Sequence, residues 1–327
     1  MATPRSRRLS FTAAGRVNGL ASQEGDLNMP TARVVLYIAL VLVNLTAIAA
    51  WLRSARRRRL RDRPSSADVA IGFVANFLDT LGIGSYAQIT ALFKMRGRPA
   101  DELIPGTLNV GGIIPSFVGC WLFVIAITVE PVLLTCMVAS AAVGAWIGAD
   151  IVSRLPRRAI QLFMGAALLI AAVFFLLQNL GISVSPGTAI GLTGWRFGTA
   201  IASNFVFGAL MCIGIGNYAP TMALLGLLGM NPIAAYPIMM GSDGLLIPVA
   251  ALGFLRSQRF SHAAALGLTA GGAVGTLCAF PLVNAIGSHL SLMRWLVMVV
   301  VIYAGVSMLL SAGKRPLPLE PIVSELR

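Results

Sequence analysis

The chain has 327 residues, of which 57% are hydrophobic and 11% charged, and its mean hydropathy is +0.82. Apolar stretches long enough to cross a hydrocarbon core, which takes about 20 helical residues, recur along most of it. This pattern excludes a soluble globular protein and predicts an all-α polytopic membrane protein. The net charge of +13 would suggest nucleic acid as the partner of a soluble protein. Here the arginines lie at the ends of apolar segments, where they indicate the cytoplasmic side, so we expect a lipid bilayer around the chain and no nucleic-acid partner.

The N-terminal region divides into a polar tail and an apolar segment. Residues 1–30 are polar and arginine-containing, so we expect a disordered tail, or an over-long gene start with Met29 as the true initiator. In residues 31–65, the run from Val34 to Trp51 is long enough to span a bilayer and is followed by the arginines of Arg53–Arg63. A cleaved signal peptide would carry its positive charge before the apolar run. An extra N-terminal transmembrane helix with a cytoplasmic arginine block is therefore predicted.

A short motif then occurs twice, 132 residues apart: Gly82-Ile83-Gly84-Ser85-Tyr86-Ala87 returns as Gly214-Ile215-Gly216-Asn217-Tyr218-Ala219. The same offset pairs further residues: Ala70 with Ala202, Phe73 with Phe205, Val74 with Val206, Leu78 with Leu210 and Pro105 with Pro237. After a shift of one residue, Ala142-Val143-Gly144 matches Ala273-Val274-Gly275. The sequence therefore predicts two repeats, residues 66–182 and 183–312, and a C-terminal tail at 313–327.

Each repeat contains four apolar segments: 68–93, 103–128, 131–152 and 159–180 in the first copy, and 200–225, 234–255, 262–286 and 290–311 in the second. Basic clusters lie between them: Lys94/Arg96/Arg98, Arg154/Arg157/Arg158, Arg256/Arg259 and Lys314/Arg315. If every segment spanned the membrane, these clusters would fall on both faces, against the positive-inside rule.

The clusters all fall on one face if the first segment of each repeat enters the membrane and returns as a hairpin of two half-helices. About a dozen residues on either side of each Gly-Ile-Gly suit such a re-entrant arm. Three spanning helices then remain in each repeat, and because three is odd, the second repeat is inverted relative to the first. A full-length but broken helix at each motif is the alternative.

The two motifs are the predicted binding site. A helix break within a membrane persists only where protein or a hydrated cavity satisfies the free backbone groups. Glycine permits the irregular backbone, and a half-helix that restarts at Ser85 or Asn217 directs free N–H groups and a positive dipole end at the tip, which suits an anion. The candidate residues here are Gly82, Gly84, Ser85, Tyr86, Gly214, Gly216, Asn217 and Tyr218. The alternative is that the glycines only let helices pack closely.

Other polar residues in apolar surroundings are candidates to complete the pocket. Thr107 and Asn109 follow Pro105, and Ser242 follows Pro237, so the second segment of each repeat presents polar groups. Asp79 and Asp243 are costly inside a bilayer and are candidates for proton coupling. Asp79 has a second interpretation, as a structural partner of a neighbouring amide such as that of Asn76. Asp150, in contrast, is expected to form an interfacial ion pair with Arg154.

The sequence contains no pattern typical of an enzyme or of a metal site. The four cysteines lie singly in apolar stretches without CxxC spacing, so buried thiols are expected, without disulfides or zinc. The two histidines, His262 and His289, lie near predicted segment ends, which explains them without a metal. Neither a histidine or acidic cluster nor a Ser–His or Ser–Lys pair within the bilayer is evident. We expect no cofactor, no metal and no enzymatic activity.

These features resemble the TauE/SafE family of sulfite and organosulfonate permeases. The resemblance rests on both hairpin motifs, on the stretch Pro105-Gly106-Thr107-Leu108-Asn109, and on the run from Gly144 to Arg158, and it covers about residues 66 to 312. It implies a bacterial-type inner-membrane permease with an internal duplication, which moves small, often sulfur-containing anions. The chain departs from the family in placing Ser85-Tyr86 and Asn217-Tyr218 where a denser glycine cluster is common, and in adding the N-terminal anchor.

The sequence thus predicts a multi-pass secondary transporter (permease) of the bacterial inner membrane for a small anion such as sulfite or an organosulfonate. It would work by alternating access around the two tips. A membrane-embedded scaffold or assembly protein that keeps the permease fold without transport is the alternative.

Overall fold

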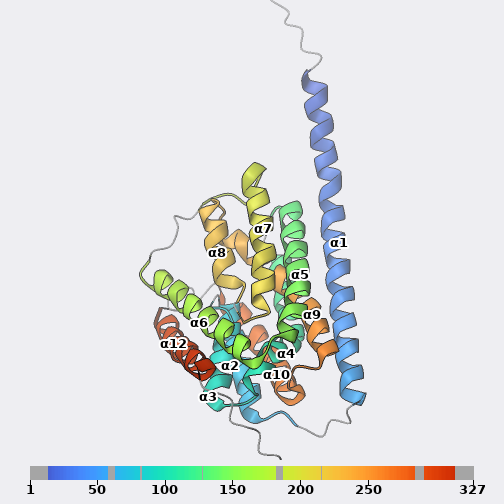
Figure 1. Cartoon of the computed structure of the whole chain (residues 1–327). Coiled ribbons are helices and arrows are strands. Elements are labelled where there is room, and N and C mark those ends of the chain that lie inside the picture. Colours follow the sequence, from blue (N-terminus) through green and yellow to red (C-terminus); the bar gives the residue numbers. More distant parts are fainter. Residues whose placement is uncertain are drawn as a thin grey trace, which may run out of the picture.

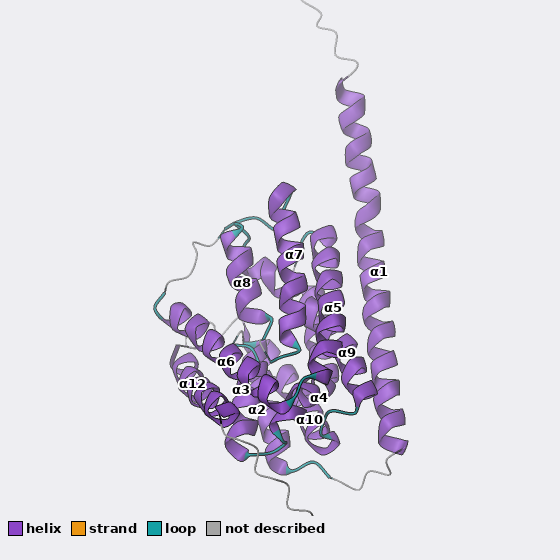
Figure 2. Cartoon of the chain, viewed as in Figure 1, coloured by secondary structure: helices purple, strands orange, loops and turns teal. Residues whose placement is uncertain are grey.

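The computed structural model describes residues 14–57, 63–81, 83–126, 128–181, 187–214, 216–283 and 291–313, and it is helical (Figures 1 and 2). The helices are α1 (Ala14–Arg57), α2 (Ser66–Thr80), α3 (Tyr86–Arg96), α4 (Ile104–Ala126), α5 (Pro131–Arg154), α6 (Arg157–Asn179), α7 (Gly194–Met211), α8 (Tyr218–Leu227), α9 (Pro232–Ser257), α10 (His262–Ala279) and α12 (Ser291–Gly313). Two 3₁₀ turns, η1 (Asp101–Leu103) and η2 (Phe280–Leu282), precede α4 and follow α10. The predicted all-α class is confirmed.

Five helical segments among the described residues are long and apolar enough to cross a membrane: Val34–Arg56, Asp101–Ala126, Pro131–Arg154, Ala234–Ser257 and His262–Leu282. They include the predicted N-terminal anchor and the second and third segments of each repeat. The predicted fourth segments correspond to α6 and α12, each of 23 residues. The first 13 residues lie outside the described part, and no helix end falls at the expected boundary near residue 30, because α1 begins at Ala14.

The helix breaks lie at the two predicted motifs. The first segment divides into α2 and α3, which end at Thr80 and begin at Tyr86. The corresponding segment of the second repeat divides into α7 and α8. Gly84 has φ +81° and Gly214 has φ +101°, and only glycine adopts such angles without strain. Gly82 and Ile215 lie outside the described residues.

Each pair of half-helices folds back, so that its two outer ends lie together. At the first pair, Arg96 near the end of α3 forms an ion pair of 2.5 Å with Asp68 near the start of α2. At the second, Arg196 near the start of α7 donates to the carbonyl of Leu228, which follows α8, over 3.4 Å. In Figure 1, α2 and α3 occupy the lower part of the molecule and α7 and α8 the upper part. Both breaks therefore lie at the tips of helix hairpins.

The helix contacts follow the internal repeat. The first helix of each repeat packs on the helix of the third segment of the other: α2 on α10, and α7 on α5. The central helices α4 and α9 pack on each other, as do the last helices α6 and α12. The correspondence extends to single residues. A β carbon built on Gly144 would lie 1.9 Å from the carbonyl oxygen of Phe205, and one built on the equivalent Gly275 would lie 2.3 Å from that of Phe73. Small residues thus allow the backbones to touch at both seams.

One face of the molecule collects the basic clusters. Lys94 of α3 and Asp101 of η1 form an ion pair of 2.8 Å, and Arg157 of α6 lies 3.7 Å from Asp101. Lys94 also donates to Ser311 near the end of α12. Further hydrogen bonds connect the remaining segments: Arg259 with the carbonyls of Ser153 and Leu155, and Gln258 with Ser54 near the end of α1. The arginine-rich end of α1 and the basic loops of both repeats therefore lie on the same face.

Candidate functional site

The two hairpin tips meet each other inside the molecule. A β carbon built on Gly84 would lie 3.8 Å from Cβ of Tyr218, and one built on Gly216 would lie 3.9 Å from Cβ of Tyr86. The contacts are reciprocal, because Gly84 and Tyr86 are the repeat equivalents of Gly216 and Tyr218. These distances are ordinary van der Waals contacts, unlike the much closer approach at Gly144 and Gly275. Gly84 and Gly216 therefore do not form close-packed seams, whereas a β carbon on Gly214 would lie 3.2 Å from the Met164 side chain.

Each tip places the start of a helix beside an aspartate. Ser85 and Asn217 are the N-cap residues of α3 and α8, and neither side chain caps its own helix. Asp79, one residue before the end of α2, and Ser85 line the same cavity. Asp243, from α9, accepts a hydrogen bond of 3.4 Å from the Asn217 amide. Free N–H groups and the dipole at a helix start stabilise negative charge. In this structure an aspartate side chain therefore lies beside each tip.

A small cavity lies between the repeats beside the tips. Its volume is about 20 Å³, enough for about one water molecule. Its wall is formed by α2, α3, α4, α9 and α10, with the polar side chains Asn76, Asp79, Thr80, Ser85, Tyr86, Ser116, Asp243 and Thr276. Both repeats contribute to this wall. A polyatomic anion does not fit this volume.

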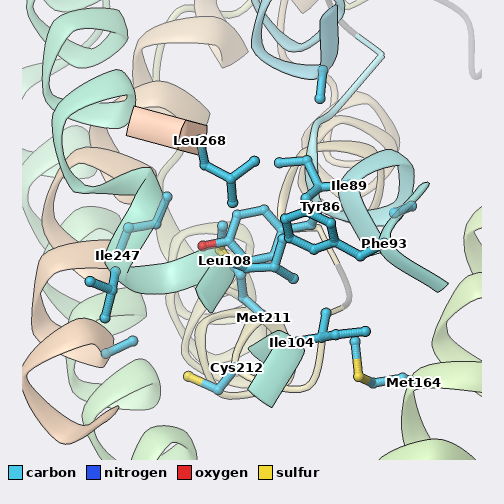
Figure 3. Packing of buried hydrophobic residues seen from close by; sticks show 14 of the residues in the cluster. Tyr86, Ile89, Phe93, Ile104, Leu108, Met164, Met211, Cys212, Ile247 and Leu268 are labelled. Carbon is cyan, nitrogen blue, oxygen red and sulfur yellow. The ribbon is translucent and has the colours of Figure 1, made fainter. Parts of the chain in front are cut away.

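Four of the predicted residues, Asp79, Ser85, Tyr86 and Asp243, line this cavity. Figure 3 shows the Tyr86 ring at the centre of an apolar cluster that combines Leu108 of the first repeat with Met211 and Leu268 of the second. Its hydroxyl donates to Oδ1 of Asn109 over 3.2 Å. The amide of Asn109 in turn donates to the carbonyl of Pro105. Asn109 therefore holds the Tyr86 hydroxyl and does not itself line the cavity.

Other predicted residues lie elsewhere. The Thr107 hydroxyl donates to the carbonyl of Leu103 and accepts from the backbone N–H of Ser261, because its side chain points along α4 toward the start of α10. Ser242 accepts from the amide of Asn204, on the side of α9 next to α7. The Tyr218 ring packs edge-on against Tyr236, with ring centroids 5.8 Å apart. These side chains support the walls and do not line the cavity. Gly82 lies outside the described residues.

The interpretation of Asn76 as the partner of Asp79 stays a hypothesis, and the described hydrogen bond of the Asn76 amide goes elsewhere. The Asn76 amide donates to the carbonyl of Gly72, one turn earlier in α2, over 2.9 Å. Asp79 is at the end of the same helix, where its neighbour is Ser85 across the tip. The predicted surface pair of Asp150 with Arg154 is confirmed, with a distance of 2.8 Å.

Several polar residues of the site were not predicted. Thr80, Ser116 and Thr276 line the cavity from three different helices. Asn204 and Thr221 extend the polar network behind the second tip, where the Thr221 hydroxyl donates to Oδ1 of Asn217 over 2.6 Å. Threonine and serine are common in membrane helices, where they bond the preceding turn, so their presence alone gives no signal. In the part of the chain that the structure describes, no three His, Cys, Asp or Glu side chains form a group that could hold a metal ion.

A comparison with protein families places this architecture among known membrane proteins. The family model described as sulfite exporter TauE/SafE matches residues 23–175, just under half of the chain. The predicted resemblance to the TauE/SafE family is confirmed. No curated protein and no solved structure matches the chain. The TauE/SafE family implies a membrane transport protein for sulfite or related anions, and the apolar helices of this chain form a multi-pass membrane protein in agreement with it.

The extent of the TauE/SafE match differs from the expected one. It begins at residue 23 and therefore includes the membrane-crossing part of α1. The expectation that this helix is an addition to the family is wrong, since it belongs to the matched segment. The match ends at residue 175, near the end of the first repeat. The second repeat is related to the family only through its sequence similarity to the first repeat.

Proposed function

We propose that this TauE/SafE protein is a secondary transporter of a small anion, such as sulfite or an organosulfonate, in the bacterial inner membrane. The observation that carries the proposal is the meeting of the two tips beside one closed cavity with walls from both repeats. Rocking of the repeats against each other would open this cavity to one side at a time. The volume of about 20 Å³ supports a closed intermediate in such a cycle, because the anion enters only when the tips separate.

The two repeats are proposed to have opposite orientations in the membrane. The fold-back of both hairpins and their placement in opposite parts of the molecule in Figure 1 support this arrangement. The exchange of contacts between repeats supports a two-fold axis that relates them. Because basic residues are retained in the cytoplasm, the face that holds Lys94, Arg157 and Arg259 is assigned to the cytoplasm.

This orientation has a direct test in a cysteine-free chain with one cysteine introduced at a time. Arg98→Cys lies just after the first hairpin and Leu227→Cys, at an exposed position, at the end of the second. We expect an impermeant maleimide to label Arg98→Cys from the cytoplasmic side and Leu227→Cys from the opposite side. Arg154→Cys, on the basic face, serves as the cytoplasmic control. Labelling of both test positions from one side would overturn the inverted arrangement.

The anion is proposed to replace a carboxylate of the protein at the tips. The N–H groups at the starts of α3 and α8, together with Ser85 and Tyr86, would bind it. Asp79 and Asp243 already line the cavity, so an entering anion would be a third negative charge in a space of low dielectric. Protonation of one aspartate removes one of these negative charges, which couples one proton to one anion. Asp243 is buried whereas Asp79 is half-buried, and burial favours the neutral form of a carboxyl group, so Asp243 is the proposed proton carrier.

A thermal-shift panel in detergent tests the function itself. The ligands are sulfite, sulfate, sulfoacetate, taurine, acetate and chloride, each measured across a pH series. We expect one or more of the anions to raise the Tm, and taurine, which is zwitterionic, to stabilise less than sulfoacetate. Uptake of the best ligand into proteoliposomes follows as the transport measurement. If no anion stabilises or crosses, transport is refuted and the scaffold interpretation gains.

A further inference from the structure

Two helices that form the cavity wall contain an interior proline. Pro115 lies in α4 and Pro248 in α9. Proline has no N–H, so the carbonyl four residues earlier in the helix has no intrahelical donor. The two carbonyls are those of Gly111 and Gly244. A buried carbonyl without a donor is destabilising, and in a membrane no bulk water replaces the missing bond.

Both carbonyls receive a donor from another helix. The Thr269 hydroxyl of α10 donates to the carbonyl of Gly111 over 2.9 Å. The amide of Asn44 in α1 donates to the carbonyl of Gly244 over 2.8 Å, and also to the carbonyl of Leu40 in its own helix. Asn44 is 1% exposed. The proline-containing turn of α4 is therefore bound by α10, a helix of the repeats. The corresponding turn of α9 is bound by the N-terminal helix α1, which lies outside both repeats.

The bond from Asn44 reaches the backbone next to a site residue. Gly244 follows Asp243, which lines the cavity and accepts from Asn217 at the second tip. The α9 backbone has little space here, because a β carbon on Gly244 would lie 2.5 Å from Cβ of Cys120 in α4. A shift of this turn of α9 would move Asp243 relative to the tip. The position of the Asp243 carboxylate thus depends on how the Gly244 carbonyl is held.

The oxygen atom of the Asn44 side-chain amide indicates why an asparagine is present at this position. In the described part of the chain, its Oδ1 atom is buried and has no hydrogen-bond partner. An unsatisfied buried oxygen is unfavourable, and a leucine of similar volume would fill this place without that penalty. The amide is therefore explained by its N–H donors and not by packing.

We propose that Asn44 is a positioning residue for the anion site, so that α1 is a working part of the transporter as well as a membrane anchor. By satisfying the carbonyl that Pro248 leaves free, it fixes the turn of α9 that carries Asp243. The inference rests on the proposed function only in using anion affinity as its readout. It adds Asn44 and helix α1, which lie outside the two repeats, to the elements that form the proposed anion site.

The test exchanges one donor for another. Asn44→Leu removes the amide, and we expect the Kd of the best anion to rise about tenfold, as for the loss of one hydrogen bond to a buried group. Pro248→Ala restores a backbone N–H that can donate to the Gly244 carbonyl within α9. The double variant Asn44→Leu/Pro248→Ala should therefore have a Kd within about twofold of that of Pro248→Ala alone. A residue that only packs would show no such rescue. Asn44→Ala replaces Asn44→Leu if the latter is not recovered folded.

Two controls match these changes. Thr46→Val removes a polar group from the exposed side of α1, where the hydroxyl bonds only the carbonyl of Leu42 among the described contacts, and should leave the Kd unchanged. Pro237→Ala removes the other interior proline of α9 and should not rescue Asn44→Leu. An unchanged Kd in Asn44→Leu, or equal rescue by both proline variants, would overturn the proposal.

A second readout does not need an anion. With the other three cysteines replaced by alanine, Cys120 reports on the same turn of α9, because it is buried against Gly244. Asn44→Leu should increase the rate of Cys120 modification by a permeant maleimide, and the double variant should reverse the increase. If wild type binds no anion while this pattern holds, the proposed transport function fails and the positioning by Asn44 stands. An unaltered Cys120 rate in Asn44→Leu refutes the positioning independently of transport.

Discussion

Replacement of both Gly84 and Gly216 by leucine should abolish the stabilisation by anions while leaving the protein inserted in the membrane. The β carbons alone would already contact the tyrosine of the opposite tip, so the remaining side-chain atoms have to separate the tips. At Gly84 the φ of +81° adds backbone strain. At an anion concentration about 100 times Kd, wild type should gain about 2.7 kcal/mol in unfolding free energy, and the double variant should gain none. Thermal unfolding with and without anion measures the difference.

The control for this experiment uses glycines with open surroundings. Gly198 in α7 and Gly313 at the end of α12 have no neighbouring atoms within 4 Å of a built β carbon. Leucine at both of these positions should leave anion stabilisation intact. If the Gly84/Gly216 variant still responds to the anion as wild type does, the tips are not the binding site.

Asp243→Asn should make anion binding nearly independent of pH. In wild type we expect the affinity to rise as the pH falls, because protonation removes a negative charge from the cavity before the anion enters. For uptake of one proton per anion, the change approaches about tenfold per pH unit above the titration of the carboxyl. An asparagine at position 243 is neutral at every pH, so the variant should bind as tightly at high pH as wild type does at low pH. Isothermal titration across a pH series measures both curves.

Two further variants identify which aspartate carries the proton. Asp79→Asn should retain most of the pH dependence if Asp243 takes up the proton, and should lose it if the assignment is reversed. Asp150→Asn, which alters the exposed ion pair with Arg154, should behave as wild type. A wild-type affinity that does not vary with pH would refute proton coupling through either carboxylate.

The helix breaks and the tips could be predicted from the sequence because they depend on local chemistry. Glycine at positions 84 and 214 marks a backbone that other residues do not adopt, and the second occurrence of the motif separates signal from chance. The segment boundaries also follow the prediction closely: α5 and α9 end at Arg154 and Ser257, beside the basic residues that mark the membrane surface.

The remaining site residues depend on tertiary contacts that one sequence does not encode visibly. Thr107 and Ser242 were chosen because they follow prolines, but the direction of a side chain around a helix depends on the packing of its neighbours. Thr107 therefore faces Ser261, and Ser242 faces Asn204. Thr276 reaches the cavity only because α10 packs against α2 and α4. Asn44 was not predicted because its partner Gly244 is 200 positions away.

The ion pairs at the end of the first hairpin give the two repeats unequal mechanical properties. Lys94 and Asp101 are 12% and 8% exposed, and Gln161 of α6 also donates to Asp101. At the 132-residue offset the second repeat has Gly226 and Ile233 in their places, without charge. Separating Lys94 of α3 from Asp101 would leave buried charges uncompensated. The described contacts at the base of the second hairpin are hydrogen bonds without an ion pair: Arg196 donates to the carbonyl of Leu228, and backbone bonds join Ala189 to Gly229 and Asn231. In the proposed transport cycle we therefore expect a higher activation barrier for opening on the basic side than for opening on the opposite side.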